Sequence, residues 1–318
     1  MTARDKYREL CAREPSIPLF CRDYWLDALA RDSWDVVLLE RGAAIIGALP
    51  FVKHAALGFT YLQMPTLTQY LGPWISYPAG QKQHSKLSHE KELFTALIEK
   101  LPTHDYFEQN FHHAVTNWLP FYWKAFTQTT RYTYTLDDLS NVSALFTGFR
   151  SNIKTDIKKA QKAVRVVVTD DLAKFYQVNR LTFSRQHKEQ PYSLPLLERL
   201  DAELARRGQR RILLAIDDAG AVHAGVYLVW DAHTAYYLMG GGDPALRSSG
   251  ATSLLVWEAI QHAATVTKAF DFEGSMIEPI ERVFRAFGAT QRPYSRVTKA
   301  SSQKMRLRLL VEGFMGRR

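Results

Sequence analysis

The stretch Ala235–Ile260, AYYLMGGGDPALRSSGATSLLVWEAI, decides the fold of the second half of the chain. Its aromatic run Tyr236–Met239 predicts a strand, and three glycines at 240–242 predict its end. Beyond the loop, polar residues recur at helical spacing from Glu258 to Thr265, which leaves the other positions apolar and able to pack on a sheet. The stretch therefore predicts a strand, a glycine loop and a helix.

The loop has the features of an anion-binding site. Its six candidate donor-binding residues are Arg247, Ser248, Ser249, Gly250, Ala251 and Thr252. A helix that begins after a glycine offers unpaired N–H groups and a positive dipole end to phosphate oxygens. Arg247 adds a charge-assisted contact. The alternative is an ordinary strand-to-helix turn in which the glycines serve only backbone geometry.

The composition is that of a protein with two ordinary soluble domains: 318 residues, 46% of them hydrophobic and 23% charged. The net charge of +9 favours acidic partners, namely nucleic acid, a membrane surface or a phosphorylated cofactor. The two cysteines, Cys11 and Cys21, are too few for a disulfide framework and favour a reducing compartment. Because Gly42–Val52 is too short to span a bilayer and the first residues are charged, we expect a cytoplasmic protein.

The first half predicts an α/β domain. Residues 1–20 are expected to be irregular, because Pro15 and Pro18 interrupt a helix. The expected elements are a helix at 23–30, strands at 36–39, 43–52 and 59–64, a helix around 87–101, a strand at 105–109, a short helix at 118–126 and a strand at 131–136.

The second half predicts a similar order. It begins with one helix whose basic residues recur every four positions and form a cationic stripe: Arg150, Lys154, Lys158 and Lys162. Such a stripe is either a solvated face or a contact to an RNA backbone. The later elements are a strand at 166–168, helices at 171–186 and 196–207, a hairpin of 212–216 and 221–230, the opening stretch, a strand at 270–273, a helix at 277–287 and a strand at 295–298.

The two halves repeat each other. One offset, 220 − 42 = 178, relates Gly42 to Gly220, Gln69 to Arg247, and Gly72 to Gly250. Farther along, 287 − 126 = 161 relates Trp123–Phe126 to Phe284–Phe287. Such matches in a constant order rarely arise by chance, so we infer two copies of one αβ domain. We expect a degenerate N-terminal copy at 1–138, a C-terminal copy at 139–300 and a basic tail at 301–318.

The element order of the second half resembles the GNAT acyltransferase fold, whose pyrophosphate loop has the pattern Q/R-x-x-G-x-G/A before a helix. Arg247 and Gly250 match this pattern, whereas Thr252 stands where it has Gly or Ala. Two such halves in tandem, with Asp271–Ser275 and the ending Phe284–Gly288, are similar to the Fem-type peptidoglycan-bridge aminoacyltransferases and their FemAB-like relatives. The resemblance covers most of residues 20–300. It implies an α/β fold with a mixed sheet in two tandem GNAT-like domains.

The resemblance also implies a reaction, the transfer of an acyl group from acyl-CoA, such as acetyl-CoA, to an amine bound between the two domains. In the first copy of the loop, Pro73 removes an N–H donor and Trp74 fills phosphate space, so we expect the donor in the second domain only. The first domain is then expected to shape the acceptor cleft. The expected substrate contacts are Gln69, Tyr70, Arg150, Lys154 and Tyr237.

Two carboxylates are the candidate catalytic residues. Asp271 and Glu273 alternate with Phe270 and Phe272, so a strand places both acids on one face. Either can accept a proton from the ammonium of the acceptor, and their proximity raises one pKa. The alternative is a pair of solvated acids on an exposed strand face. Backbone N–H groups near 237–240 are candidates to hold the donor's carbonyl oxygen.

The resemblance leaves the proton donor open. GNAT enzymes often place a tyrosine in the final helix to protonate the departing thiolate, and the aligned residue here is Phe284. This favours a Fem-like scheme in which substrates or water carry protons. The alternative functions are transfer from aminoacyl-tRNA to a cell-wall precursor, and a catalytically silent module that binds RNA or anionic glycans. The coiled-coil arm of larger Fem-type members is absent from the sequence.

Two further patterns are expected to be structural. His104, His112 and His113 lack a cysteine or carboxylate at ligand spacing, so we expect surface histidines and no metal site. The tail has an amphipathic pattern with Leu307 on its apolar face and Arg306 on its basic face. It is expected either to touch a membrane surface or to dock on its own domain.

Overall fold

The structure is a computed structural model that describes residues 1–185 and 189–315, and contacts divide the chain into two compact units. The first unit contains Met1–Arg131 and the segment from Pro293 onward, and the second contains Tyr132–Arg292. Both units combine helices with a sheet that has parallel and antiparallel pairs. The predicted α/β class with mixed sheet is therefore confirmed.

The first unit is built on the strand order β1-β2-β3-β5-β12, with β4 paired to β2. Its strands are β1 (Trp34–Arg41), β2 (Ala44–Ala56), β3 (Phe59–Gln63), β4 (Trp74–Ile75), β5 (Tyr106–Asn110) and β12 (Thr290–Ala300). Its helices are α1 (Ala3–Arg13), α2 (Asp23–Ala30), α3 (Gln83–Glu99), α4 (Leu119–Trp123) and α11 (Gln303–Met315). Side chains alternate along β1, so that Val37 joins the core under α3 and Val36 the core under α1.

The expectation of an irregular N-terminus is wrong, because α1 occupies most of it. Thr2 and Asp5 form a reciprocal capping box at the start of α1. The helix ends at Arg13, so Pro15 follows it and does not interrupt it. Tyr7 and Leu10 bury the inner face of α1, and tertiary packing of this kind stabilises a helix that local propensity leaves marginal.

The second unit is built on the strand order β6-β11-β10-β9-β8-β7. Its strands are β6 (Thr127–Leu136), β7 (Arg165–Thr169), β8 (Arg210–Ile216), β9 (Val222–Trp230), β10 (Thr234–Gly242) and β11 (Ala269–Asp271). Its helices are α5 (Val142–Gly148), α6 (Ser151–Ala160), α7 (Leu172–Arg185), α8 (Leu194–Arg206), α9 (Ala251–Val266) and α10 (Glu278–Ala286). The pair β10 and β11 is parallel, and the other pairs from β6 to β7 in this order are antiparallel.

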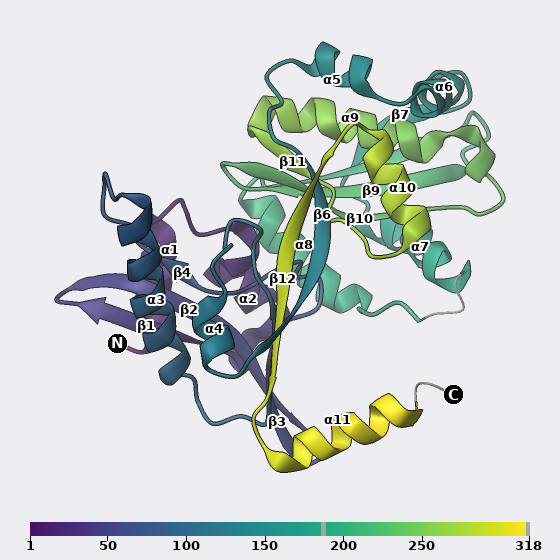
Figure 1. Cartoon of the computed structure of the whole chain (residues 1–318). Helices are drawn as coiled ribbons and strands as arrows, with labels where there is room; N and C mark the ends of the chain where they lie inside the picture. The colour runs from purple at the N-terminus through teal and green to yellow at the C-terminus, as the bar shows by residue number, and fades with distance from the viewer. Residues whose placement is uncertain (186–188, 316–318) are drawn as a thin grey trace. The chain divides into compact units, whose positions relative to one another are not determined.

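Helices cover both faces of this second sheet. Figure 1 shows α9 on one side of the strands and α7 with α8 on the other. Two neighbouring residues of β9 point to opposite faces of the sheet. Val226 joins the core around α9, whereas the ring of Tyr227 packs against Phe175 of α7. The predicted hairpin of β8 and β9 and the strand, loop and helix of Ala235–Ile260 are present.

The structure differs from the sequence-based expectation at two boundaries. The single helix predicted from Phe146 to Lys162 is two helices, because Phe149 and Arg150 have extended backbones between α5 and α6. Strands β6 and β12 each contribute to both units. The end of β6 pairs with β11 through Thr135, whereas most of β12 pairs with β5, which assigns residues after Arg292 to the first unit.

The C-terminal tail is helix α11, and it docks on the first unit. Met305 is buried, and the guanidinium of Arg308 lies 5.5 Å from the ring centroid of Phe59 and donates a hydrogen bond to Tyr61. Leu307 and Leu310 remain exposed, so membrane contact by this helix stays a prediction. Among the described helices, none combines the length and apolar character that a membrane span requires.

Candidate functional site

The predicted donor loop connects β10 to α9 through a short 3-10 turn, Arg247–Ser249. Gly250 follows with φ +79° and is the N-cap of α9. A Cβ at this position would lie 2.4 Å from the carbonyl oxygen of Asp156, so glycine is required both by the left-handed backbone and by the close approach of α6. The glycine that the loop pattern demands is therefore also the contact point between α6 and α9.

The loop exposes positive charge and backbone donors. The N-cap Gly250 has no side chain to cap α9, and the Ser249 hydroxyl accepts a hydrogen bond of 3.3 Å from the N–H of Ala251. Among the described residues, the next N–H groups of the first turn have no side-chain cap and can bond to a ligand. Arg247 is exposed and makes no hydrogen bond or ion pair with the described residues. Lys159 of α6 reaches the loop and donates a hydrogen bond of 2.5 Å to the carbonyl of Ser248. Thr252, where the pattern has Gly or Ala, is exposed and leaves the loop backbone accessible.

Strands β10 and β11 pair only briefly and then separate. Their register runs from Thr234 opposite Ala269 to Tyr236 opposite Asp271, and the pairing ends there. β10 continues for six more residues, Tyr237–Gly242, to the loop. One edge of this segment therefore lacks a partner strand on the β11 side and offers backbone N–H and C=O groups to an extended ligand.

β10 also contains a bulge beside this separation. Its pairing with β9 shifts between Tyr237 and Met239, so Leu238 is an extra residue without a partner across the strands. A bulge disrupts the ladder locally and redirects side chains, and bulges are frequent near active sites. The expected carbonyl-binding N–H groups at 237–240 coincide with this bulge.

The sequence predicted that the glycines at 240–242 end the strand, but β10 includes all three of them. Each glycine lets atoms of another residue approach the strand backbone closely. A Cβ on Gly240 would lie 1.6 Å from the Tyr237 hydroxyl, and one on Gly241 would lie 2.6 Å from the Cα of Asn179 in α7. Asn179 in turn donates a hydrogen bond of 2.9 Å to the carbonyl of Gly240. Asn179 was not predicted, since nothing in its local sequence distinguishes it from other helical polar residues.

Asp271 is buried at the point of separation, with 1% of its surface exposed. Its Oδ1 accepts hydrogen bonds from the hydroxyl of Thr133 and, at 2.7 Å, from the backbone N–H of Glu273. Its Oδ2 has no hydrogen-bond partner among the described residues. Burial raises the pKa of Asp271 to about 6, against the opposing effect of the Thr133 hydrogen bond. The alternative of a solvated Asp271 on an exposed strand is therefore wrong.

Glu273 does not continue the strand, which corrects the expectation that the two acids share a strand face. β11 ends at Asp271, and Glu273 has a left-handed backbone with φ +58°. Gly274 is next, with φ +60°, and a Cβ there would lie 2.1 Å from the carbonyl oxygen of Tyr132, so the chain turns tightly against β6. Burial, and next the charge of Asp271, raise the pKa of the Glu273 carboxyl well above its usual range.

The predicted substrate contacts fall on different elements. Lys154 donates a hydrogen bond of 2.7 Å to the carbonyl of Thr147, and the N–H of Arg150 bonds to the carbonyl of Ala286, so both help to join α5, α6 and α10. In the first unit, Tyr70 is 3% exposed and packs on Phe20. We therefore assign Tyr70 to the core.

The first copy of the loop, around Gln69, leads into a different element. The carbonyl of Gln69 accepts a hydrogen bond from Asn110, and Gly72 precedes the two-residue strand β4. The next helix, α3, begins 83 − 72 = 11 residues after Gly72, whereas α9 begins directly after Gly250. This copy therefore has no helix N-terminus at its loop.

The histidines do not form a metal site within the described residues, where no group of three or more His, Cys, Asp or Glu is arranged around a common point. The rings of His112 and His113 lie 4.1 Å apart, and burial lowers the pKa of His112 to about 3. His104, His112 and His113 are all half-buried, and the ring of His112 packs against Tyr70.

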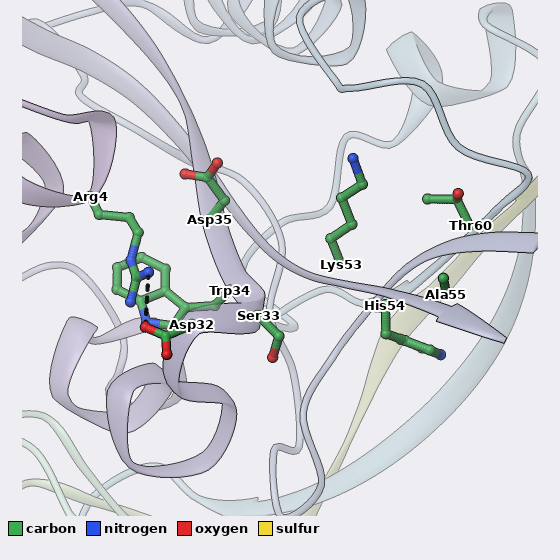
Figure 2. Close-up of a pocket in the computed structure, with 9 residues that line it drawn as sticks. All are labelled: Arg4, Asp32, Ser33, Trp34, Asp35, Lys53, His54, Ala55 and Thr60. Atoms are coloured by element: carbon green, nitrogen blue, oxygen red, sulfur yellow. Dashed lines mark ion pairs between the residues drawn. The ribbon is translucent and has the colours of Figure 1, made fainter.

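The first unit has a hollow of about 420 Å³, shown in Figure 2. It is lined by Arg4, Asp32, Ser33, Trp34, Asp35, Lys53, His54, Ala55 and Thr60, none of which is a predicted site residue. The guanidinium of Arg4 lies over the Trp34 ring at 4.6 Å and pairs with Asp27 and Asp32. Its charge is thus already balanced within the fold.

Comparison with known proteins gives a family for the second unit and a fold for the chain. Residues 147–275, which include the predicted donor loop and Asp271, match the family model of the acetyltransferase (GNAT) domain. No curated protein sequence matches the chain at a significant level. The crystal structure of FemX is similar over 93% of this chain and 96% of its own, with a TM-score of 0.66 and 12% identity.

Two other solved structures share this fold. A tandem GNAT protein from the clavulanic acid biosynthesis pathway matches over 94% of this chain and 95% of its own, with a TM-score of 0.52 and 10% identity. The C-terminal domain of a putative lysylphosphatidylglycerol synthetase from Agrobacterium fabrum matches over 97% and 94%, with a TM-score of 0.55 and 12% identity.

The second unit is thus built on a domain with the GNAT acyltransferase fold. The chain as a whole has the tandem fold of FemX and of the tandem GNAT protein, so the predicted fold and the resemblance are confirmed.

Proposed function

We propose that this protein is an N-acyltransferase that moves an acyl group from acyl-CoA to an amine. One observation carries the proposal. The segment Tyr237–Gly242 of β10, whose edge has no partner strand on the β11 side among the described residues, is joined by a short loop that contains Arg247 to the helix N-terminus at Gly250. An extended pantetheine-like chain can bond to such an edge while its pyrophosphate lies at the helix N-terminus. The buried carboxyl of Asp271 lies where that edge begins.

The proposed chemistry needs a neutral amine and a polarised carbonyl. Asp271 accepts a proton from the acceptor ammonium through Oδ2, the oxygen that the fold leaves unbonded among the described residues. Thr133 and the N–H of Glu273 hold the other oxygen and fix the orientation of the carboxylate. Backbone N–H groups at the bulge around Leu238 stabilise the oxyanion of the tetrahedral intermediate.

Replacement of Arg247 with alanine is expected to weaken acetyl-CoA binding about tenfold, because an exposed charge-assisted contact to phosphate contributes about 1.5 kcal/mol. Isothermal titration calorimetry measures this change. Arg165→Ala removes the same charge from an exposed position of β7 and is expected to leave the affinity unchanged. Equal weakening by both variants would assign the effect to net charge and contradict a pyrophosphate contact at the loop.

The pH dependence of the reaction depends on the raised pKa of Asp271. The carboxylate must be ionised to accept a proton, so kcat/KM is expected to fall about tenfold per pH unit below pH 6. With an unperturbed aspartate, kcat/KM would stay constant until the pH fell to about 4. Initial rates of thiol release from acetyl-CoA between pH 4.5 and 8 measure the profile, and a flat profile down to pH 5 would exclude Asp271 as the base.

A second candidate donor is aminoacyl-tRNA. Lys158 and Lys162 are exposed at the end of α6 and just beyond it, which suits an RNA backbone. Joint replacement of both by alanine is expected to abolish tRNA retention if this donor is correct, and to leave acetyl-CoA turnover unchanged if acyl-CoA is the donor. Filter binding at two salt concentrations and thiol release distinguish the two donors. Binding of tRNA without any transfer would support the silent module.

A further inference from the structure

The proposed reaction leaves one proton without a source. When the C–S bond of the donor breaks, the sulfur leaves as a thiolate and must be protonated. The residue that aligns with the tyrosine of other GNAT enzymes is Phe284, which has no proton to donate. Phe284 is 7% exposed and packs against Phe272 at a ring-centroid distance of 5.2 Å. α10 thus presents a hydrocarbon surface at this position.

A tyrosine from the sheet lies against this same surface. The ring of Tyr237 meets Phe284 edge to face, with centroids 5.9 Å apart. Its hydroxyl points along β10 to Gly240, where it occupies the place that a Cβ would take. Because the bulge at Leu238 adds a residue, positions 237 and 240 face the same side of the sheet. Only glycine at 240 admits the hydroxyl there.

The Tyr237 hydroxyl keeps its proton free for donation within the described part of the chain. The side chain of Tyr237 is half-buried, and no hydrogen bond joins its hydroxyl to another described residue. Burial raises the pKa of Tyr237 to about 12, so between about pH 6 and pH 12 its hydroxyl is protonated while Asp271 is ionised. A phenol that is kept neutral at the beginning of the unpaired strand edge can donate a hydrogen bond to an atom that gains negative charge.

We propose that Tyr237 is the proton donor to the leaving sulfur, a role that rests on the proposed acyl transfer. The lone pair of the amine forms the C–N bond, the C–S electron pair leaves on sulfur, and the Tyr237 hydroxyl supplies the proton that gives free thiol. Asp271 has by then released the ammonium proton to solvent, and it accepts the second proton, which the nitrogen loses as the amide forms. Exchange with solvent then returns a proton to Tyr237 and removes one from Asp271, so that the sum is amine plus thioester giving amide plus thiol.

The placement of the two groups suits these roles. Asp271 pairs with Tyr236 in parallel register, so its side chain shares the face of Tyr236. Tyr237 is the next residue of the strand and points to the other face, toward Phe272 and Phe284. A thioester between the separating strands therefore has its proton acceptor on one face of the sheet and its proton donor on the other.

Two variants test the role by different means. Tyr237→Phe removes the hydroxyl, and Gly240→Ala keeps it but displaces it, since the new Cβ claims its place. Both are expected to lower kcat for thiol release from acetyl-CoA by about 100-fold, the scale of a lost general acid. Tyr176→Phe removes the hydroxyl of another half-buried tyrosine, in α7, and is the matched control. A mixture of amino acids, polyamines and glucosamine serves as the acceptor pool.

Binding and kinetics are measured separately. The acetyl-CoA dissociation constant, from calorimetry, is expected to change less than about threefold in both variants, and circular dichroism is expected to show the wild-type fold. Wild-type kcat in Tyr237→Phe would overturn the assignment while acyl transfer stands. A loss of activity in Tyr176→Phe of the same size as in Tyr237→Phe would also overturn it. If the wild-type protein neither binds acetyl-CoA nor releases thiol, the proposed function fails, and the assignment falls with it.

Discussion

Asp271→Asn is expected to lower kcat by about 10²–10⁴-fold. It is also expected to make the protein more stable than the wild type, by an amount that grows as the pH rises. The first effect arises from the loss of the proton acceptor, since an amide cannot take a proton from the amine. The second arises from burial. The carboxyl of Asp271 is 1% exposed, and its pKa is raised to about 6, so its ionised form is disfavoured in the folded state.

The sign of the stability effect is set by linkage. An unfolded aspartate has a pKa of about 3.9, below the folded value of about 6. As the pH rises, Asp271 therefore loses its proton at a lower pH in the unfolded chain than in the folded one. The stability that the protonated carboxyl contributes is fully present below about pH 4 and is lost as the pH rises to about 6. The difference of about two pH units corresponds to about 3 kcal/mol. The asparagine amide cannot ionise, so we expect the variant to gain this amount relative to wild type between about pH 4 and pH 7.

Urea unfolding at several pH values measures the stability effect, and thiol release measures the rate. Asp218→Asn makes the same substitution at an exposed turn of the β8–β9 hairpin and is expected to change neither. Parallel stability curves for wild type and the Asp271 variant would show that the carboxyl titrates as it does in the unfolded chain. Retained kcat would remove Asp271 from the mechanism. The combination of lost activity and gained stability is typical of a functional buried acid.

Gly250→Ala is expected to cost about 2–4 kcal/mol of unfolding free energy and to weaken acetyl-CoA binding at least about tenfold. A left-handed residue with a Cβ costs about 1–2 kcal/mol. The rest arises because the new Cβ would lie 2.4 Å from the carbonyl oxygen of Asp156, and that backbone belongs to the packed helix α6. Relief of this clash is expected to move the N-terminus of α9 away from α6 and to displace the N–H groups that we propose bind phosphate.

Gly208→Ala provides the control for backbone strain alone. Gly208 has φ +64°, and nothing lies within 4 Å of its Cβ position, so alanine there carries only the conformational cost of about 1 kcal/mol. Chemical denaturation gives the stability of both variants, and calorimetry gives their acetyl-CoA affinity. Equal losses of stability in the two variants, with wild-type affinity in Gly250→Ala, would contradict both the tight α6–α9 contact and the donor loop.

Local sequence patterns predict those helices, strands and turns whose formation depends mainly on residues close together in the sequence. The strand, loop and helix of Ala235–Ile260, the hairpin of β8 and β9, and helix α2 at Asp23–Ala30 are indicated by periodicity and turn residues, and the structure contains them. Helix α1 was missed because its capping box at Thr2 and Asp5 was outweighed by two prolines that lie beyond its end. The break between α5 and α6 was missed because the apolar period continues through Phe149.

The site was predictable only in part, because its geometry depends on contacts between distant segments. Thr133 bonds to Asp271 across 138 residues of sequence, and no local pattern marks it. Asn179 approaches the β10 glycines from α7, and the sequence does not show that Gly240 makes room for a hydroxyl. The left-handed backbone of Glu273 likewise depends on the turn against β6, which is formed only in the folded unit.

The central claim is that the loop at Arg247–Thr252 binds acyl-CoA, and thermal unfolding with excess acetyl-CoA tests it most directly. A ligand at about one hundred times its dissociation constant adds about 2.7 kcal/mol, which raises the unfolding midpoint by several degrees. We predict this rise for the wild type and a smaller one for Arg247→Ala. We expect none with a polyanion that lacks adenosine, such as polyphosphate. No shift with acetyl-CoA, or an equal shift with polyphosphate, would contradict the claim.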